Sequence, residues 1–209
     1  MAVRINVVPR TYADLAALAS PSSSTQPEAI VFSFFDNEDF TSLWTTLNFF
    51  QTIQTDPTKG NIQTAGTLSA DQYFQLQAIT LDFIIAASSQ ASSGAPQIVD
   101  DLLGIMNSSR AIVNMTMAMK TYIQAPIHAF HSSGGISVQY QLGTPTGSAL
   151  GNYAQNWYPD GGYWVGGAQV LPPRQTFTFQ VIGQGAPNAL NATRTGRFTM
   201  WGTLYRKVA

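Results

Sequence analysis

The sequence contains no cysteine, which excludes disulfide bonds, thiolate metal ligands and cysteine nucleophiles. Charged residues are also scarce: Asp, Glu, Lys and Arg make up 10% of the 209 residues, against about 25% in a typical soluble domain. The net charge of −1 does not provide the field that phosphate binding requires, so we expect no specific nucleic-acid partner. A free monomer depends on surface charge for solubility. The shortage of charge therefore predicts that partner proteins cover much of the surface.

Long apolar segments and catalytic motifs are missing as well. The longest apolar stretch, Ile79–Ala87, is interrupted by Asp82 and is too short to span a bilayer. No hydrophobic region follows Met1–Asn6, so we expect no secretory signal peptide. There is no phosphate-binding loop, dinucleotide fingerprint or Gly-X-Ser-X-Gly motif. We therefore expect a protein that is not an enzyme and that binds no cofactor.

Two groups of side chains could carry chemistry, and each has a simpler interpretation. The spacing of His128 and His131 allows both to bind one metal ion, as in a cupin-like enzyme, but no third histidine or nearby carboxylate completes the ligand set. Asp36, Glu38 and Asp39 could form a catalytic carboxylate pair or a calcium site, but the glycine turn and distal Glu of an EF-hand loop are absent. We predict exposed or hydrogen-bonded histidines, a solvated acidic turn and no metal site.

Alternating apolar residues predict a chain of strands with short helices. The segment 73–85 changes phase at Gln77-Ala78, which predicts a β-bulge. Pro96 opens a short helix that ends near Met106, with Asp100 and Asp101 in its first turn, where they stabilise the helix dipole. Further strands are expected at 30–34, 113–123, 136–142, 175–182 and 197–208. This pattern predicts an all-β fold, a single jelly-roll β-sandwich of about eight strands.

The domain organisation follows from a change in composition near residue 27. Residues 1–27 read as an N-terminal arm, a short helix over Tyr12–Ala19 and a linker rich in serine and proline. Residues 28–209 then form the jelly-roll domain.

The last strand, Arg197–Val208, is predicted to be apolar on both faces. One face can lie on the domain's own core, whereas the other, with two large aromatic side chains, requires a second sheet or a neighbouring subunit as its cover. The first face carries Phe198, Met200 and Leu204, and the second carries Trp201 and Tyr205.

Charge is unevenly distributed along the chain. Up to Asp101 there are ten acids and three bases, whereas Asp160 and seven bases follow it. Either the two halves mix in one sandwich and the asymmetry cancels, or identical copies present complementary acidic and basic edges to one another.

An aromatic loop is predicted at Trp157-Tyr158-Pro159-Asp160-Gly161-Gly162-Tyr163-Trp164. Its rings could stack on sugars, as in a carbohydrate-binding or receptor-binding spike protein, or they could lie in a subunit contact. We favour the contact, because Trp and Tyr are enriched in interfaces. The candidate contact residues are Phe40, Trp44, Trp157, Tyr158, Tyr163, Trp164, Trp201 and Tyr205.

Three stretches of the chain share a pattern with one known family. They are Asn48-Phe49-Phe50-Gln51-Thr52 leading to Asn61, Gly66-Thr67-Leu68 and 74–79; Asp101-Leu102-Leu103 leading through 109–111 and 119–120 to 125–127 and 133–135; and the ending 198–206. Together they resemble the coat proteins of tailless icosahedral bacteriophages with an internal membrane, whose jelly rolls stand upright in the shell.

The resemblance implies a structural virion protein without catalysis. Many identical copies, together with other capsid proteins, would pack side by side in an icosahedral shell made in the host cytoplasm. The chain is short for a two-barrel coat protein, so a single jelly roll is implied, as either a major or a smaller accessory subunit. The N-terminal arm would reach a neighbouring subunit or the internal viral membrane.

Overall fold

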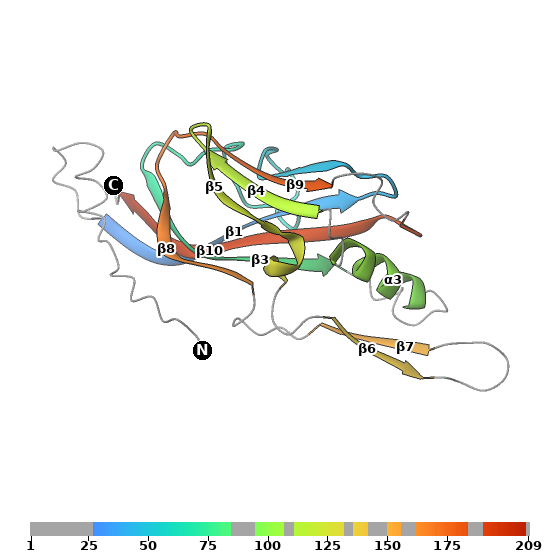
Figure 1. Cartoon of the computed structure of the whole chain (residues 1–209). Helices are drawn as coiled ribbons and strands as arrows, with labels where there is room; N and C mark the ends of the chain where they lie inside the picture. Colours follow the sequence, from blue (N-terminus) through green and yellow to red (C-terminus); the bar gives the residue numbers. More distant parts are fainter. Residues whose placement is uncertain are drawn as a thin grey trace.

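The computed structural model describes residues 27–84, 95–106, 111–131, 136–141, 150–155, 162–183 and 190–207 (Figure 1). The predicted arm, helix and linker lie outside these residues except for Pro27, and so do Trp157 and Tyr158. The described elements, in chain order, are β1 (Pro27–Phe40), β2 (Thr46–Phe49), β3 (Gln72–Ile84), α3 (Ala95–Met106), β4 (Ala111–Met117), β5 (Lys120–Pro126), η1 (Ile127–Phe130), β6 (Ile136–Gln141), β7 (Leu150–Gln155), β8 (Tyr163–Leu171), β9 (Phe177–Gly183) and β10 (Arg194–Lys207).

Eight of these strands form two four-stranded antiparallel sheets that face each other, and β6 and β7 form a separate hairpin (Figure 1). The strand orders are β1-β10-β3-β8 and β2-β9-β4-β5. Strands from the two halves of the chain pair in reverse order: β1 with β10, β2 with β9, β3 with β8, and β4 with β5. A long antiparallel hairpin rolled into two facing sheets is a jelly roll. The predicted all-β jelly-roll sandwich is therefore confirmed.

The core between the two sheets is rich in phenylalanine. The ring of Phe198 lies 4.8 Å from that of Phe49 and 4.9 Å from that of Phe179, centroid to centroid, in edge-to-face geometry. Such pairs contribute about 0.5–1.5 kcal/mol each beyond the burial of their area. Phe177, Phe179 and Val181 alternate inward along β9, as predicted, and all three are buried.

The central strand β10 lies between β1 and β3 and pairs with both. Its register with β3 shifts between Trp201 and Gly202, so that Gln77 is the additional residue on β3. This confirms the predicted β-bulge at Gln77-Ala78. A Cβ atom at Gly202 would lie 2.1 Å from the carbonyl oxygen of Gln75, so the close approach of the two backbones requires glycine.

Three predictions of local structure are wrong. The acidic segment Asp36–Asp39 is not a turn, because β1 continues through it to Phe40, paired with β10. The predicted strand 113–123 is the hairpin β4–β5, which turns at Ala118 and Met119, both with positive φ. Met119 lies in this turn and is therefore fully exposed. The predicted aromatic loop ends inside β8, which begins at Tyr163.

Acids from the first half of the chain meet bases from the second half inside one subunit. β1 pairs with β10, and Arg206 Nε donates to Glu28 Oε2 at 2.7 Å. Asp101 and Arg194 form a second ion pair across the same division. The interpretation in which the two halves mix therefore accounts for these charges.

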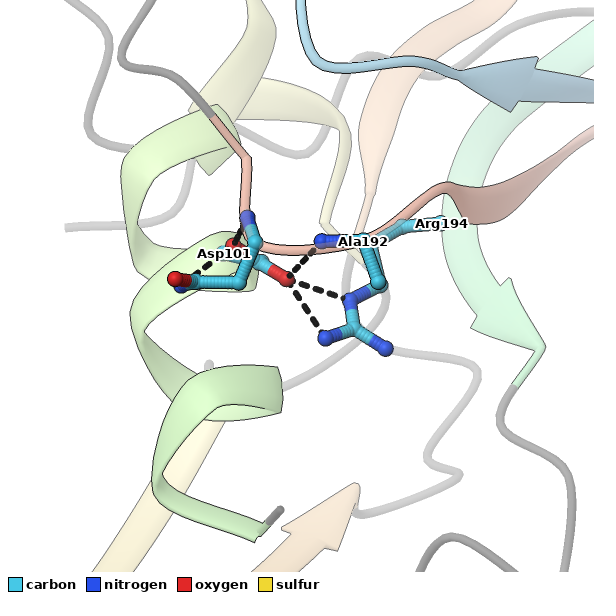
Figure 2. A network of polar contacts seen from close by, with 4 residues as sticks. Asp101, Ala192 and Arg194 are labelled. Atoms are coloured by element: carbon cyan, nitrogen blue, oxygen red, sulfur yellow. Dashed lines mark hydrogen bonds and ion pairs between the residues drawn. The ribbon is translucent and has the colours of Figure 1, made fainter.

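Asp101 ties α3 to the residues that lead into β10 (Figure 2). Its carboxylate is buried and accepts five contacts, from the backbone N–H groups of Asn191 and Ala192, from Asn191 Nδ2, and from Arg194 Nε at 2.7 Å and Nη2 at 2.5 Å. Asp101 does not lie in the first helical turn as predicted, because α3 begins at Ala95 and has no acidic residue there. Its role is a buried ion pair, because folding carries its side chain to a cation from a distant strand.

We expect Asp101→Ala to destabilise the fold by about 3–5 kcal/mol, because the largely buried Arg194 side chain would lose its carboxylate partner and three further hydrogen-bond donors would lose their acceptor. Urea unfolding followed by circular dichroism measures this change. The exposed pair Glu28–Arg206 offers a matched control, and Glu28→Ala is expected to cost less than about 1 kcal/mol. Equal losses in the two variants would contradict this account of Asp101.

Candidate subunit interface

The structure divides the predicted contact residues into buried and exposed groups. Phe40, Trp44 and Tyr205 are 0%, 3% and 4% exposed, so they pack inside the subunit and do not present a surface to a second copy. Their prediction as contact residues is therefore corrected. Tyr163 is partly buried and its ring stacks on that of Phe130, with 4.8 Å between the centroids. The exposed candidates are Trp164 and Trp201, at 70% and 46%.

Tyr205 shows why an outward position in a strand does not guarantee exposure. It lies opposite Tyr73 on β3, and these two rings pack together with Val170 of β8. Its hydroxyl donates to Gln75 Oε1 at 3.0 Å, and burial raises its pKa above the ordinary value. The prediction that the second face of β10 needs an external cover is thus wrong for Tyr205, because neighbouring strands of the same subunit cover it.

Trp164 and Trp201 lie in one row across the outer surface of the β1-β10-β3-β8 sheet. Trp201 on β10 faces Ser33 on one side and Ala78 on the other, and Ala78 in turn faces Trp164 on β8. Neighbouring strands are about 4.8 Å apart, so the two tryptophans are roughly 10 Å apart, backbone to backbone. Met200 and Gly202, on either side of Trp201, lie on the core side of β10. Because alternate residues of a strand face opposite sides, Trp201 and its row lie on the outer surface.

We call this surface the aromatic face and define it by Val31, Trp164, Trp201 and Ile84, the large apolar residues that remain exposed on it. Val31 is 90% exposed on β1, two residues from Ser33 in the row. Val31 is not among the predicted contact residues, although its place between the inward residues Ile30 and Phe32 could have indicated it. Val31, Trp201 and Trp164 lie at neighbouring register positions, whereas Ile84 lies six residues farther along β3 than Ala78. A cluster of exposed apolar side chains such as the first three is typical of a surface that contacts another molecule.

A hydrogen bond holds the Trp201 indole in place. Its Nε1 donates to Thr80 Oγ1 at 3.0 Å, and Thr80 and the neighbouring Thr199 are both buried. Ala78, between the two tryptophans, is 4% exposed even though it is on the outer surface. The indole is therefore positioned before any contact is made, which lowers the entropy cost of binding.

Arg197, a cation on this sheet surface, is already hydrogen-bonded within the subunit. Arg197 Nε donates to Asn37 Oδ1 and its Nη2 donates to the Thr58 carbonyl oxygen, both at 2.8 Å. The guanidinium group also lies 4.8 Å from the centre of the Phe35 ring. The Arg197 guanidinium group would therefore keep these contacts if a partner covered the aromatic face.

The acidic segment of β1 is only partly solvated, because Asp39 is exposed as predicted whereas Asp36 is not. Asp36 is completely buried and accepts hydrogen bonds from the backbone N–H of Phe50 at 2.6 Å and from Gln54 Nε2 at 3.1 Å. Burial raises the pKa of Asp36, although these hydrogen bonds oppose the shift. Burial, followed by the charges of Asp36 and Asp39, raises the pKa of Glu38 to about 7. The carboxylate of Asp36 thus joins β1 to the segment after β2.

The predicted histidines lie on and beside η1. His128 is exposed and His131 is partly buried, and His131 forms a bridge to Leu81 through its backbone. Among the described residues, no group of three or more His, Asp or Glu side chains could hold a metal ion. Within the same residues, no helix has the length and apolar character needed to cross a membrane.

No protein-family model matches the chain, and a search of curated proteins finds no match to its sequence.

The shifted pKa of Glu38 predicts a dependence of stability on pH. Because the folded state raises this pKa from 4.5 to about 7, it favours the protonated form. Its contribution is fully present below pH 4.5 and is lost as the pH rises through 7. We expect Glu38→Gln to reduce the loss of stability between pH 5 and pH 8, as measured by urea unfolding at both values. Asp100→Asn, which removes an exposed acid from α3, is the control, and an equal pH response in both variants would contradict the prediction.

Proposed function

We propose that this protein is a structural virion protein, a capsid subunit of an icosahedral phage shell that assembles through lateral contacts between jelly rolls. The observation that carries the proposal is a jelly-roll sandwich with two exposed tryptophans in one row across an outer sheet surface. The low charge of the chain and the resemblance of its sequence to coat proteins support the same function. Its partners are then further copies and other capsid proteins.

The energy available from the aromatic face points to assembly with many contacts. Covering the exposed parts of Trp164 and Trp201 would contribute roughly 6 kcal/mol, from the area of an indole side chain and about 25 cal/mol per Å². Association of two proteins costs an estimated 4–15 kcal/mol in lost freedom of motion. Two tryptophans therefore offset this cost only at the lower end of its range. A subunit held by this face alone would pair weakly, whereas a shell repeats the contact and adds others.

Purified protein at rising concentration is expected to form large particles, measured by light scattering and electron microscopy. We expect Trp164→Ala combined with Trp201→Ala to raise the concentration needed for particles at least about tenfold, which corresponds to about 1.4 kcal/mol. Leu43→Ala, which truncates an exposed apolar residue outside the sheets, is the matched control. A stable monomer at high concentration, with no association with lipid or other coat proteins, would refute the proposed function.

A carbohydrate-binding protein of the spike type is the second candidate. It is favoured by one observation: Trp164 and Trp201 lie on one sheet surface beside the exposed amide of Gln77 and the hydroxyl of Thr203. Indole rings stack on sugars while such polar groups bind their hydroxyls.

A glycan array separates the two candidates. If the alternative holds, the unsubstituted protein binds a defined set of glycans and Trp164→Ala removes the signal. If the capsid proposal holds, neither form binds glycans, and the substitution changes particle formation instead.

A further inference from the structure

The second sheet carries a row of amide side chains on its outer surface. Asn48 on β2 faces Gln180 on β9, Gln180 faces Asn114 on β4, and Asn114 faces Gln124 on β5. Their neighbours along the strands, such as Phe49, point into the core, so alternation places these four side chains outside. We call Asn48, Gln180, Asn114 and Gln124 the amide row. It crosses all four strands of the sheet at one register.

The surface around the amide row is almost free of charge. Beside it, the hydroxyls of Thr116 and Thr178 share a hydrogen bond of 2.5 Å. The four strands, all within the described residues, contain one charged residue, Lys120, whose ammonium group lies 5.7 Å from the centre of the Tyr122 ring at the β4–β5 turn. A partner that covers the amide row and stays clear of the β4–β5 turn therefore removes no ion of these strands from water, which is the most expensive part of burying a polar surface.

Hydrogen bonding within the row is incomplete. Gln180 Nε2 donates to Asn48 Oδ1 at 2.7 Å. Asn114 Oδ1, by contrast, is shielded from water and has no hydrogen-bond partner in the described part of the chain, although the residue as a whole is partly exposed. An unpaired buried acceptor costs about 1–3 kcal/mol. The row thus contains one acceptor that the subunit leaves unpaired and also shields from solvent.

We propose that the amide row packs against the amide row of a second copy, related by a two-fold axis that runs along the row, so that each amide faces its own counterpart. A two-fold contact places the same surface on both sides, so the surface must be complementary to itself. A charged row would repel its copy, whereas every amide has both a donor and an acceptor and can pair with another amide. The aromatic face of a second copy is a less suitable partner for the amide row, because the N–H of Trp201 already donates to Thr80.

This inference rests on the proposed function and extends it. The two outer surfaces of a sandwich lie on opposite sides, so a subunit that uses both makes contacts in two directions. Subunits that use both the aromatic face and the amide row would then form an extended layer, whereas subunits that use either surface alone could form only dimers. Four strands at about 4.8 Å give a width of only about 19 Å, so the contact is small and its strength depends on repetition.

Substitutions of opposite charge at one position test the two-fold contact. Gln180→Glu alone and Gln180→Lys alone place like charges against each other, so each should raise the concentration for association at least about tenfold. An equal mixture of the two variants places opposite charges together and should restore association to within about threefold of the unsubstituted protein. Light scattering measures association, and circular dichroism checks the fold of each variant. The same pair at exposed Gln124 serves if Gln180 variants do not fold.

Ser42→Glu and Ser42→Lys, in the exposed turn after β1, are the matched control and should leave association unchanged, alone or mixed. Normal association of both single Gln180 variants would overturn the inference, since the row would lie outside any contact. Impaired association that mixing does not restore would also overturn it, because the row would then face a different surface.

The same experiment separates the inference from the proposed function. If the unsubstituted protein forms particles that the Gln180 variants do not alter, the function stands and the two-fold contact is refuted. If copies pair through the row, as the charge pattern reports, but no larger assembly forms, the contact stands and the proposed function is refuted. A protein that does not associate under any condition refutes both.

Discussion

The pairing of β10 with both β1 and β3 is the constraint on which the rest of this structure depends. It joins the first and last strands of the domain along fourteen register positions and places the acids of β1 beside the bases of β10. It also determines which side chains of β10 enter the core, because one register orients Phe198 and Met200 inward and Trp201 outward. The buried contact between Asp101 and Arg194 holds the approach to this strand.

The two outer sheet surfaces differ in chemical character, and this difference supports an assembling protein. One surface has exposed indoles at Trp164 and Trp201; a hydrogen bond fixes Trp201, and Arg197 on the same strand is hydrogen-bonded within the subunit. The other has amides and hydroxyls with almost no charge. A partner that covered the second sheet would meet one charged residue of its four strands, Lys120, and a partner that covered the aromatic face would meet Arg197, which is hydrogen-bonded within the subunit. Weak, repeated contacts of this kind are what a shell of identical subunits needs.

Much of the fold could be predicted from local sequence patterns. The alternation in 175–182, the phase change at Gln77-Ala78 and the helix after Pro96 are all found, because each is set by neighbouring residues. The candidate site was predicted less well. Trp164 and Trp201 are exposed, but Phe40, Trp44 and Tyr205 are inside the subunit. Aromatic side chains serve cores and interfaces equally, and composition does not separate the two uses.

The sequence by itself determined the fold class, the shortage of charge and the side of each strand on which a residue lies, because these follow from composition and a period of two. Only the tertiary structure decided that Tyr205 is covered by Tyr73, that Asp36 is buried, and that Asn48, Gln180, Asn114 and Gln124 form one row. The reason is that burial and register depend on which distant strands become neighbours. Residues 48 and 180 lie side by side only after the chain has rolled into two sheets.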